Sequence, residues 1–366
     1  MIRLSALIEQ FEQPLLAQYG HRLLPEQRQA LAAMKSCRTT LSPKMQAHCP
    51  ACEEQVFVPH SCGHRLCSHC QHHESQQWLE RQLKTLVPGA YFLLTFTLPA
   101  EFRALALAQP HTLFGLLMQC AWQTLLTFSR NDKHLQGTPG AVAVLHTHSR
   151  RLDYHPHVHV VMPAAALDTD KKRWRTRAGQ RYLFNHKALA KVFRAKLLAA
   201  ITEAELALPE RQPKQWVVDC KHVGSGEKAL VYLGRYLYRG VLQEKDILAC
   251  DQGQVTFRYR NSKTRRTETR TLPGATFLWL LLQHVLPKGF RRARHFGFLH
   301  PNSKRLIQLL HLLLKRVSSR GFEAVKPRPP LLCPCCGGPM IIVRTRLLPT
   351  LPRPQPSGTP EAARAM

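Results

Sequence analysis

The chain has 366 residues, 44% of them hydrophobic, so it can bury a sizeable core and is not a disordered chain. Its longest apolar stretches, such as 277–282, are too short to span a bilayer, and we expect no secretory signal and no membrane contact. Lysine and arginine number 52 against 23 acidic residues, a formal net charge of +29. This imbalance predicts a polyanionic partner, and nucleic acid fits best.

The first 35 residues predict two helices. Pro14 interrupts the apolar pattern of the first, and Pro25 suits the first turn of the second. Residues 37–73 are polar and rich in cysteine. Such a stretch cannot bury a core of its own, so a metal is the expected staple.

From there to about residue 300, strand and helix patterns alternate. Asn185 suits the N-cap of one helix, and Gly240 suits the C-terminal cap of another. The expected strands are 90–98, 141–148, 155–162, 216–219 and 255–259. The expected helices are 75–86, 113–128, the 190s, 227–239 and 276–285. The proline-rich tail from about 342 is expected to be disordered.

A pair of histidines, His157 and His159, lies in the strand-like segment HPHVHVVM. Alternation along a strand puts both imidazoles on one face and turns Val158 and Val160 into the core. Two imidazoles side by side make half of a divalent metal site.

The preceding strand carries His146 and His148, and only a short connection separates the two strands. They are therefore expected to pair as an antiparallel hairpin, with His146 opposite the pair as third ligand. His148 and His155 are the alternative third ligands, because a one-residue slip in register would reverse the face of His146. A histidine-rich hairpin without metal is the alternative to the whole site.

Tyr232 and Tyr236 are four residues apart in VYLGRYLYRG, so they share one face of the expected helix. A tyrosine hydroxyl beside guanidinium groups can attack a phosphodiester. Arg235 and Arg239 are the candidates to hold the phosphate oxygens, and Lys221 is a further candidate DNA-binding residue. The alternative is an amphipathic helix whose tyrosines merely pack beside its leucines.

Two cysteine knuckles, Cys49-x-x-Cys52 and Cys67-x-x-Cys70, are separated by fourteen residues. This spacing predicts a closed, structural zinc site with four thiolates. Spare ligands could form a second site or substitute in the first; they are Cys62, Cys37, His64 and His48. A third knuckle, Cys333-x-x-Cys336, is either half of a site completed from elsewhere or a turn without metal.

Four segments, taken in order, resemble the HUH-type, two-tyrosine rolling-circle transposases of bacterial insertion sequences, the IS91 family. The cysteine segment CPAC…SCGHRLCSHC is similar to the zinc-binding domain of that family, and YFLLTFTLP to its first nuclease strand. LHTHSRRLDYHPHVHVVMP resembles its histidine motif, and YLGRYLYR its tyrosine helix. VLPKGFRRARHFGFL also resembles a family signature, although the sequence offers no mechanism for it. The resemblance covers about residues 35–300.

This resemblance implies a DNA transposase, an enzyme that nicks one strand, becomes linked to it through a 5′-phosphotyrosine and passes the strand on by transesterification. It implies catalytic Mg²⁺ or Mn²⁺ at the histidines, structural Zn²⁺ at the cysteines, and single-stranded DNA of element ends and target as partner. Two tyrosines allow two successive transfers, whereas a related group uses one, for which Tyr236 is the candidate. The implied location is the bacterial cytoplasm, in association with the nucleoid.

The expected fold class is α+β: an antiparallel-sheet HUH nuclease core with central histidine strands and helices covering one face, preceded by a small helical, zinc-ribbon-like domain. The expected domains are 1–85, helical and zinc-binding; 86–300, catalytic; 301–341, a helix and cysteine knuckle; and 342–366, the disordered tail. A replication initiator or relaxase with the same chemistry is one alternative. A non-catalytic, zinc-dependent DNA-binding protein is the other, and it leaves the histidines and tyrosines unexplained.

Overall fold

The computed structural model describes residues 2–70, 72–168, 173–177, 182–238, 240–261, 264–314 and 330–348, without the side chains of His72, His73, Arg235, Tyr238 and Leu313. The chain divides into two compact units. The larger contains Met1–Lys35 and Gly63–Arg328, and the smaller contains Ser36–Cys62 and Pro329–Met366. This division differs from the expected one, because the first helices belong to the larger unit and the first cysteine knuckle joins the C-terminal segment.

The larger unit is built on an antiparallel sheet of seven strands within the described residues. The strand order is β7-β6-β4-β5-β3-β8, and β12 also pairs with β4. The two histidine strands, β4 and β5, are central, as the sequence predicts. The strands are β3 (Tyr91–Thr97), β4 (Thr138–His148), β5 (Tyr154–Pro163), β6 (Ala165–Asp168), β7 (Arg173–Thr176), β8 (Val218–His222) and β12 (Ala293–Gly297).

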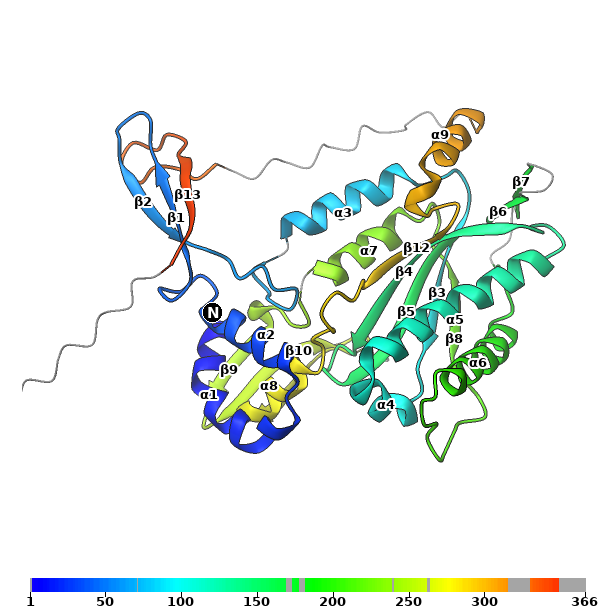
Figure 1. Cartoon of the computed structure of the whole chain (residues 1–366), viewed down its shortest axis with the longest axis horizontal. Helices are drawn as coiled ribbons and strands as arrows, with labels where there is room; N and C mark the ends of the chain where they lie inside the picture. The colour runs from blue at the N-terminus through cyan, green and yellow to red at the C-terminus, as the bar shows by residue number, and fades with distance from the viewer. Residues whose placement is uncertain are drawn as a thin grey trace, which may run out of the picture. The chain divides into compact units, whose positions relative to one another are not determined.

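Helices cover both faces of this sheet, whereas the sequence pattern predicts one covered face (Figure 1). The reason is visible in β4, which is buried along almost its whole length and therefore needs apolar neighbours on both sides. One face carries α4 (Arg103–Ala108), α5 (Pro110–Asn131) and α6 (His186–Glu203). The other carries α3 (His72–Lys84), α7 (Glu227–Tyr238) and α9 (Lys304–Leu313). No helix in the described ranges has the length and apolar character to cross a membrane.

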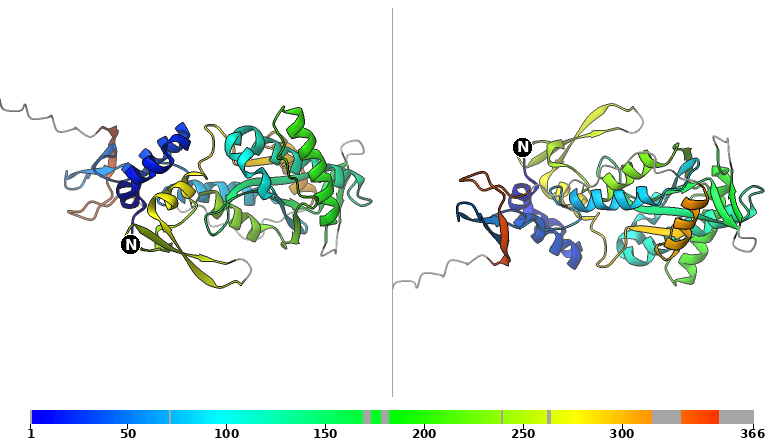
Figure 2. Two further views of the ribbon diagram at one scale, coloured as in Figure 1. Left: turned by 90° about the horizontal axis from the view of Figure 1, so that it is seen from below. Right: turned by 90° about the horizontal axis from the view of Figure 1, so that it is seen from above.

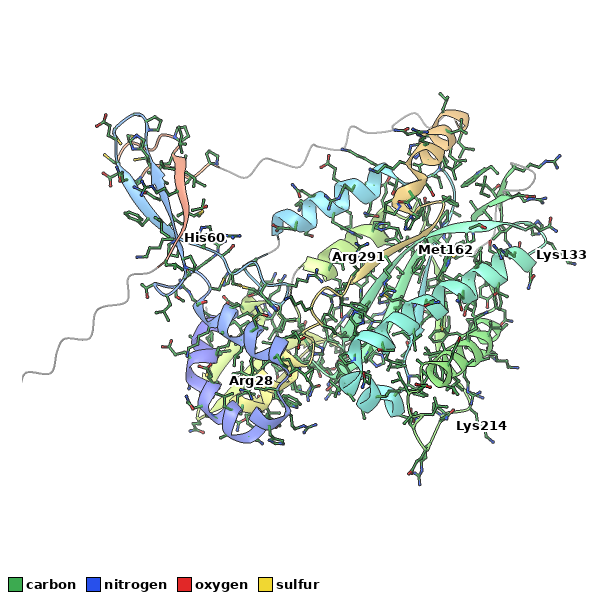
Figure 3. The ribbon with its side chains drawn as sticks, in the orientation of Figure 1. Arg28, His60, Lys133, Met162, Lys214 and Arg291 are labelled. Carbon is green, nitrogen blue, oxygen red and sulfur yellow. The ribbon has the colours of Figure 1, made fainter. Side chains whose placement is uncertain are left out.

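Local sequence explains why these elements begin and face as they do. Asn185 caps α6, its side chain accepting hydrogen bonds from the backbone N–H groups of Lys187 and Ala188, as predicted. The apolar alternation of β5 sends Val158, Val160 and Met162 into the core against α5 and α6, and Figure 3 labels Met162 on its strand.

The N-terminal helices, α1 (Leu4–Tyr19) and α2 (Pro25–Ser36), pack on α8 (Gly274–Leu282) in the larger unit. Helix α1 continues through Pro14, although the proline interrupts its apolar pattern. Phe11 and Leu15, on either side of the proline, are buried, and this packing offsets the lost hydrogen bond, a cost of about 3 kcal/mol.

A second sheet of the larger unit has the order β11-β10-β9. Its strands are β9 (Ile247–Asp251), β10 (Gln254–Arg260) and β11 (Thr267–Pro273). Val255 and Phe257 are buried while Arg258 and Arg260 are exposed, which is the basic outer face that the alternation predicts. Figure 2 shows the β10–β11 hairpin extending away from the helices.

The smaller unit contains a three-stranded antiparallel sheet of order β13-β1-β2. Its strands are β1 (Lys44–His48), β2 (Gln55–Pro59) and β13 (Ile341–Leu347). The tail was expected to be disordered from about 342, but its first residues pair with β1, Ile342 opposite Ala47 and Arg344 opposite Gln46. The rest of the expected tail, from 349, lies outside the described residues.

Candidate metal and tyrosine site

Three histidines meet on the α7 face of the central sheet. His146 of β4 lies directly opposite His157 of β5, and His159 is the next residue of β5 on the same face. Val158, between them, points into the opposite core. The candidate ligand nitrogens of the three imidazoles all lie within 4.8 Å of one another. The strand pairing therefore brings together the three residues that the sequence singled out.

Hydrogen bonds orient two of these rings. Nδ1 of His157 lies 2.6 Å from the carbonyl oxygen of His155, to which it donates, and Nδ1 of His159 lies 2.9 Å from the Thr95 hydroxyl. Both leave Nε2 for another partner, the usual arrangement around a metal. The fully buried His146 has no hydrogen-bond partner for either ring nitrogen within the described residues. A buried imidazole in this condition fits a metal ligand.

Burial keeps these imidazoles neutral. It lowers the pKa of His157 to about 3, with a further contribution from His159, and the pKa of His159 to about 4, with a further contribution from Lys221. Burial, followed by the neighbouring histidines, also lowers the pKa of His146. A neutral imidazole has a free lone pair, so at neutral pH all three rings are ready to bind a divalent cation.

The two alternative ligands lie outside this cluster. Nδ1 of His148 lies 3.1 Å from the Ser149 carbonyl oxygen, and its ring stacks on Tyr236. His155 contacts the guanidinium of Arg103 through Nδ1, at 3.2 Å. A register shift between His146 and His148 separates their environments.

Both tyrosines of α7 face the histidines, while Leu233 and Leu237 are buried in the core beneath the helix. The Tyr236 ring lies parallel to the His146 ring with centroids 3.2 Å apart, and its hydroxyl donates to the His148 carbonyl at 3.1 Å. The Tyr232 ring centroid lies 5.9 Å from that of His159, and this side chain is 40% exposed. The two hydroxyls therefore differ in access. Burial raises the pKa of both.

A cavity of about 840 Å³ opens over this group, and its walls are basic. The other predicted phosphate-binding residues are placed unevenly. The Arg235 side chain and the whole of Arg239 lie outside the described residues. Lys221 lies on β8 with its Nζ atom 2.9 Å from the Asp219 carboxylate. The arginines that do line the cavity are Arg103, Arg150, Arg151, Arg258 and Arg260.

Sequence reasoning missed two residues that support the site, Thr95 and Arg292. The Arg292 guanidinium carbon lies 5.2 Å from the centre of the Tyr236 ring. Its Nε and NH1 atoms donate to the carbonyl oxygens of Leu145 and Leu237, at 3.0 and 3.3 Å, so it ties β4 to α7. The signal was present, because Arg292 belongs to the family-like segment VLPKGFRRARHFGFL. Thr95 shares the alternating β3 pattern that was read only as a buried strand.

The smaller unit holds a cluster of four cysteines, Cys49, Cys52, Cys333 and Cys336, whose sulfur atoms lie within 4.8 Å of one another. This corrects the predicted grouping, in which Cys67 and Cys70 complete the site. Pairing of β13 with β1 explains the difference, since it brings the third knuckle beside the first. Backbone N–H groups of Cys52 and Ala51 lower the pKa of the Cys49 thiol to about 7, which favours the thiolate that zinc binds.

The remaining candidate cysteines divide between the units. In the smaller unit, the Cys62 backbone N–H lies 3.4 Å from the Cys37 sulfur and donates to it. In the larger unit, Cys67 and Cys70 are buried. Cys120 is buried in the core of the larger unit, as expected of a small apolar side chain.

Comparison with known proteins gives matches along most of the chain. A family model described as "Putative transposase" matches residues 140–306, and one described as "Transposase zinc-binding domain" matches residues 7–98. "Putative transposase y4qJ" of Sinorhizobium fredii is 31% identical over 296 residues, 75% of this chain and 74% of the relative. "Transposase for insertion sequence element IS801" of Pseudomonas savastanoi pv. phaseolicola is 25% identical over 290 residues, 74% of this chain and 70% of the relative. No solved structure matches.

The α+β fold, the cysteine cluster and these matches define a transposase with a zinc-binding domain, a class of protein that binds DNA and cleaves and transfers its strands. More narrowly, the chain belongs to the IS91/IS801 family of insertion-sequence transposases. The family resemblance of the sequence is thereby confirmed. The basic composition agrees with this assignment, because a net charge of +29 favours contact with a phosphate backbone.

Proposed function

We propose that this transposase nicks and rejoins single-stranded DNA through a 5′-phosphotyrosine, with the three-histidine cluster holding a divalent metal. One observation carries the proposal: three neutral imidazoles converge directly under two tyrosines, in a cavity walled by arginines. The Tyr236 ring lies over His146, whose two ring nitrogens have no hydrogen-bond partner within the described residues, and packing of the helix alone leaves this unexplained.

The reaction balances as a transesterification. A phenolic oxygen attacks the scissile phosphorus, the new bond joins tyrosine to the 5′-phosphate, and the bond to the 3′ oxygen breaks. The phenol loses its proton, and the departing oxygen gains one to become a 3′-hydroxyl. Attack by a 3′-hydroxyl on the phosphotyrosine reverses these changes and rejoins the strand. The phosphodiester bond count is conserved, so no external energy source is required.

Different residues would supply the nucleophile and the metal ligands. Tyr232 is the more exposed tyrosine and is placed to attack first. The Tyr236 hydroxyl instead donates a hydrogen bond to a backbone carbonyl oxygen before the reaction. Nε2 of His157 and His159 and a ring nitrogen of His146 would hold the cation, Mg²⁺ or Mn²⁺, which when bound neutralises charge on the scissile phosphate. Three imidazoles suit Mn²⁺ better than Mg²⁺, because Mg²⁺ prefers oxygen ligands.

The basic walls would bind the strand itself. Arg150 and Arg260 line the cavity beside the tyrosines, and Arg235, Arg239 and Lys221 remain proposed DNA-binding residues on sequence grounds. We assign zinc to the four clustered cysteines of the smaller unit as a structural ion, because four thiolates leave no open position. The proposed setting is the bacterial cytoplasm, at the ends and targets of the element in the nucleoid.

A labelled single-stranded oligonucleotide carrying an element end tests this function. Incubation with the full chain and Mn²⁺ or Mg²⁺ should give a covalent protein–DNA adduct, more of it with Mn²⁺. Tyr232→Phe should abolish most first cleavage and Tyr236→Phe should spare it, while the double variant should give none. Tyr182→Phe, an exposed tyrosine remote from the cavity, is the control. Tight DNA binding with no adduct under either metal would favour a non-catalytic DNA-binding protein.

The histidine variants separate the metal from the nucleophile. His157→Ala and His159→Ala should lose adduct formation while they keep DNA affinity, because the arginines that line the cavity are intact. A replication initiator or relaxase would share this chemistry. The match of the zinc-binding domain model to residues 7–98 favours rolling-circle transposition over both.

A further inference from the structure

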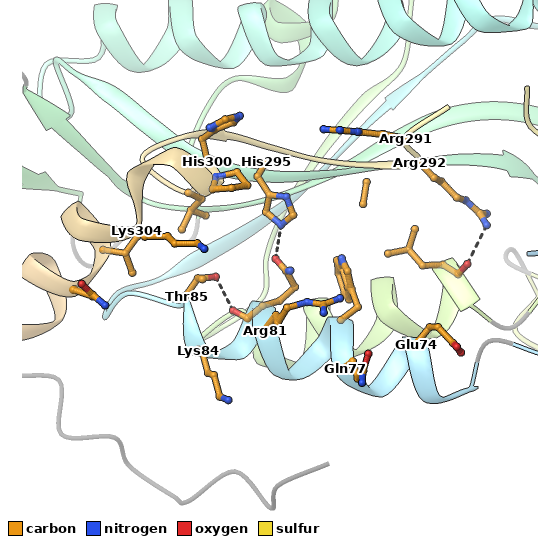
Figure 4. A pocket seen from close by; sticks show the side chains of 18 of the residues that line it. Glu74, Gln77, Arg81, Lys84, Thr85, Arg291, Arg292, His295, His300 and Lys304 are labelled. Carbon is orange, nitrogen blue, oxygen red and sulfur yellow. Dashed lines mark hydrogen bonds between the residues drawn. The ribbon is translucent and has the colours of Figure 1, made fainter. Parts of the chain in front are cut away.

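The larger unit has a second cavity, of about 800 Å³, on the same face of the sheet as the tyrosines. It lies between α3, the segment that leads into β12, and α9 (Figure 4). Its apolar floor is formed by Trp78, Leu237, Leu299 and Ile307, which belong to the core under α7. The family-like segment VLPKGFRRARHFGFL, which ties β4 to α7 through Arg292, also supplies one wall of this cavity.

The lining is strongly cationic. Its six lysine and arginine side chains face a single carboxylate, Glu74. Four of the six, Arg65, Arg81, Arg291 and Lys304, form no ion pair within the described residues. The cationic side chains are Arg65, Arg81, Lys84, Arg291, Arg292 and Lys304.

The cationic lining also affects the histidine that lies within it. Burial lowers the pKa of His295 at the centre of this cavity, and nearby His300 and Arg81 lower it further. The His295 ring is fixed by a 2.6 Å hydrogen bond from Nε2 to the Gln82 side-chain oxygen, drawn in Figure 4. Six cations that share a single lining carboxylate repel one another, so an anion placed between them would be bound favourably.

The cavity adjoins the tyrosine site through one turn of α7. Tyr236 lines the catalytic cavity and its neighbour Leu237 lines the basic one. Arg292 joins the two, since it lines the basic cavity and lies over the Tyr236 ring. Because the two cavities share this turn of α7, a strand that passes from the tyrosines over the turn would meet the basic wall next.

We propose that this basic cavity is a second DNA-binding site, which holds the phosphodiester backbone of single-stranded DNA beside the scissile phosphate. The proposal rests on the proposed nicking function for the strand's path, but the cavity's affinity for phosphates can be measured without it. Recognition is of the backbone and not of the bases, because Trp78, the aromatic residue other than histidine among the described lining residues, is only 5% exposed and offers no face for stacking.

The test compares two triple variants of the full chain that lose the same charge. Arg81→Gln/Arg291→Gln/Lys304→Gln removes three of the six cations of the cavity wall, and Lys133→Gln/Lys187→Gln/Lys214→Gln removes three exposed charges outside it. Figure 3 labels Lys133, Lys214 and Arg291 at separate places on the unit. Binding of a fluorescent single-stranded oligonucleotide is measured against salt concentration, without Mg²⁺ or Mn²⁺.

Each phosphate contact on single-stranded DNA contributes about 0.7 to the slope of log affinity against log salt, so the cavity variant should lose about 2. The control variant should keep the wild-type slope. The difference should vanish with an oligonucleotide too short to reach beyond the catalytic cavity. Equal slopes for the two variants, or a difference seen only with duplex DNA, would overturn the proposal. The readout needs no cleavage, so a chain that fails to form the tyrosine adduct can still pass or fail this test.

Discussion

At the scale of single residues, the proposed three-histidine metal site would depend on groups that do not touch the metal. The Thr95 hydroxyl, 2.9 Å from Nδ1 of His159, fixes the ring so that Nε2 points toward His146 and His157. Partners of this kind set the tautomer and orientation of a ligand, and their loss typically weakens metal binding by about 10- to 100-fold. The same role is played for His157 by a backbone carbonyl, which no substitution can remove.

Thr95→Val should therefore weaken Mn²⁺ binding by about 10- to 100-fold while the fold is retained. Valine keeps the shape and β-propensity of threonine but cannot bond to the imidazole. Titration followed by the electron paramagnetic resonance of free Mn²⁺ gives the affinity directly. Thr127→Val, which removes a hydroxyl bonded only within α5, is the matched control. Unchanged Mn²⁺ affinity in Thr95→Val would refute the orienting role.

His284 makes the stability of the larger unit depend on pH. Its side chain is 3% exposed, and burial lowers its pKa to about 3, while Nε2 donates to the Leu152 carbonyl at 3.3 Å. Above pH 6.5 the ring is neutral in both folded and unfolded chains. As the pH falls below that value, only the unfolded chain takes up the proton, so stability is lost progressively down to about pH 3.

Between pH 7.5 and pH 5, this group should cost about 2 kcal/mol of unfolding free energy. His284→Gln should lower stability at pH 7.5 but reduce the further loss at pH 5 by that amount. Chemical denaturation at the two pH values measures both quantities. His134→Gln, an exposed histidine, should follow the wild-type pH dependence. A His284→Gln chain with the same acid sensitivity as wild type would show that His284 is protonated in the folded state.

At the scale of elements, the spacing of residues along the sequence correctly predicted which side chains share a face of a strand or a helix. The alternation of HPHVHVVM places the histidines on one face of β5 and the valines on the other, and the four-residue spacing in YLGRYLYR places two tyrosines on one side of α7. The sequence pattern did not predict features that depend on packing between residues far apart in the sequence. Burial of Phe11 and Leu15 carries α1 through Pro14, and apolar residues on both faces of β4 call for helices on each side.

Strand β12 shows such a long-range constraint in one glycine. Gly297 has φ of 58°, and a β-carbon there would collide with the backbone carbonyl oxygen of Pro139 on β4. Gly297→Ala should therefore displace β12 and lower unfolding free energy by more than the strain of about 1 kcal/mol that a left-handed alanine carries. Gly289→Ala is the control, with φ of 77° and open space at its β-carbon.

The thermal or denaturant midpoints of the two variants decide this point. Gly289→Ala should show only the strain, and Gly297→Ala should add the collision, with a loss of several kcal/mol. Because Arg292 lies just before β12, adduct formation should also fall in Gly297→Ala. Equal midpoints for the two variants would mean that β4 and β12 can move apart without cost.

At the scale of the whole molecule, the zinc-binding unit joins distant parts of the sequence. The sulfur atoms of Cys52 and Cys333 lie 3.5 Å apart across 281 positions of the chain. Sequence spacing could predict that the cysteines form knuckles but not which knuckles pair, because the nearer pair, Cys67 and Cys70, has equally suitable spacing. Strand pairing of β1 with β13 decided the matter, and neither strand has a strong enough pattern to predict that pairing.

The free energy of zinc binding is large enough to hold the two distant cysteine knuckles together. Joining two points 281 residues apart in a fully flexible chain would cost about 5 kcal/mol in entropy. This figure is an upper bound, because the folded segment Gly63–Arg328 lies between the two cysteines. Structural zinc sites in small domains contribute about 10–16 kcal/mol. The apolar cluster of the smaller unit contains Ala47, Cys49, Cys333 and Met340, so two of its four buried members are proposed ligands. A core this small cannot hold three strands together without the ion.

Cys333→Ser should therefore lower bound zinc by about one ion per chain and expose β1, β2 and β13 to hydrogen exchange together, because one lost thiolate opens the site that closes all three strands. Zinc is counted by mass spectrometry of the metal, and exchange is followed peptide by peptide. The central strands β4 and β5 should keep their protection, because their core contains none of these cysteines. Cys250→Ser, a cysteine outside every cluster of the described residues, is the control. Full zinc content and protected β13 in Cys333→Ser would instead mean that the sheet, and not the metal, holds the C-terminal knuckle in place.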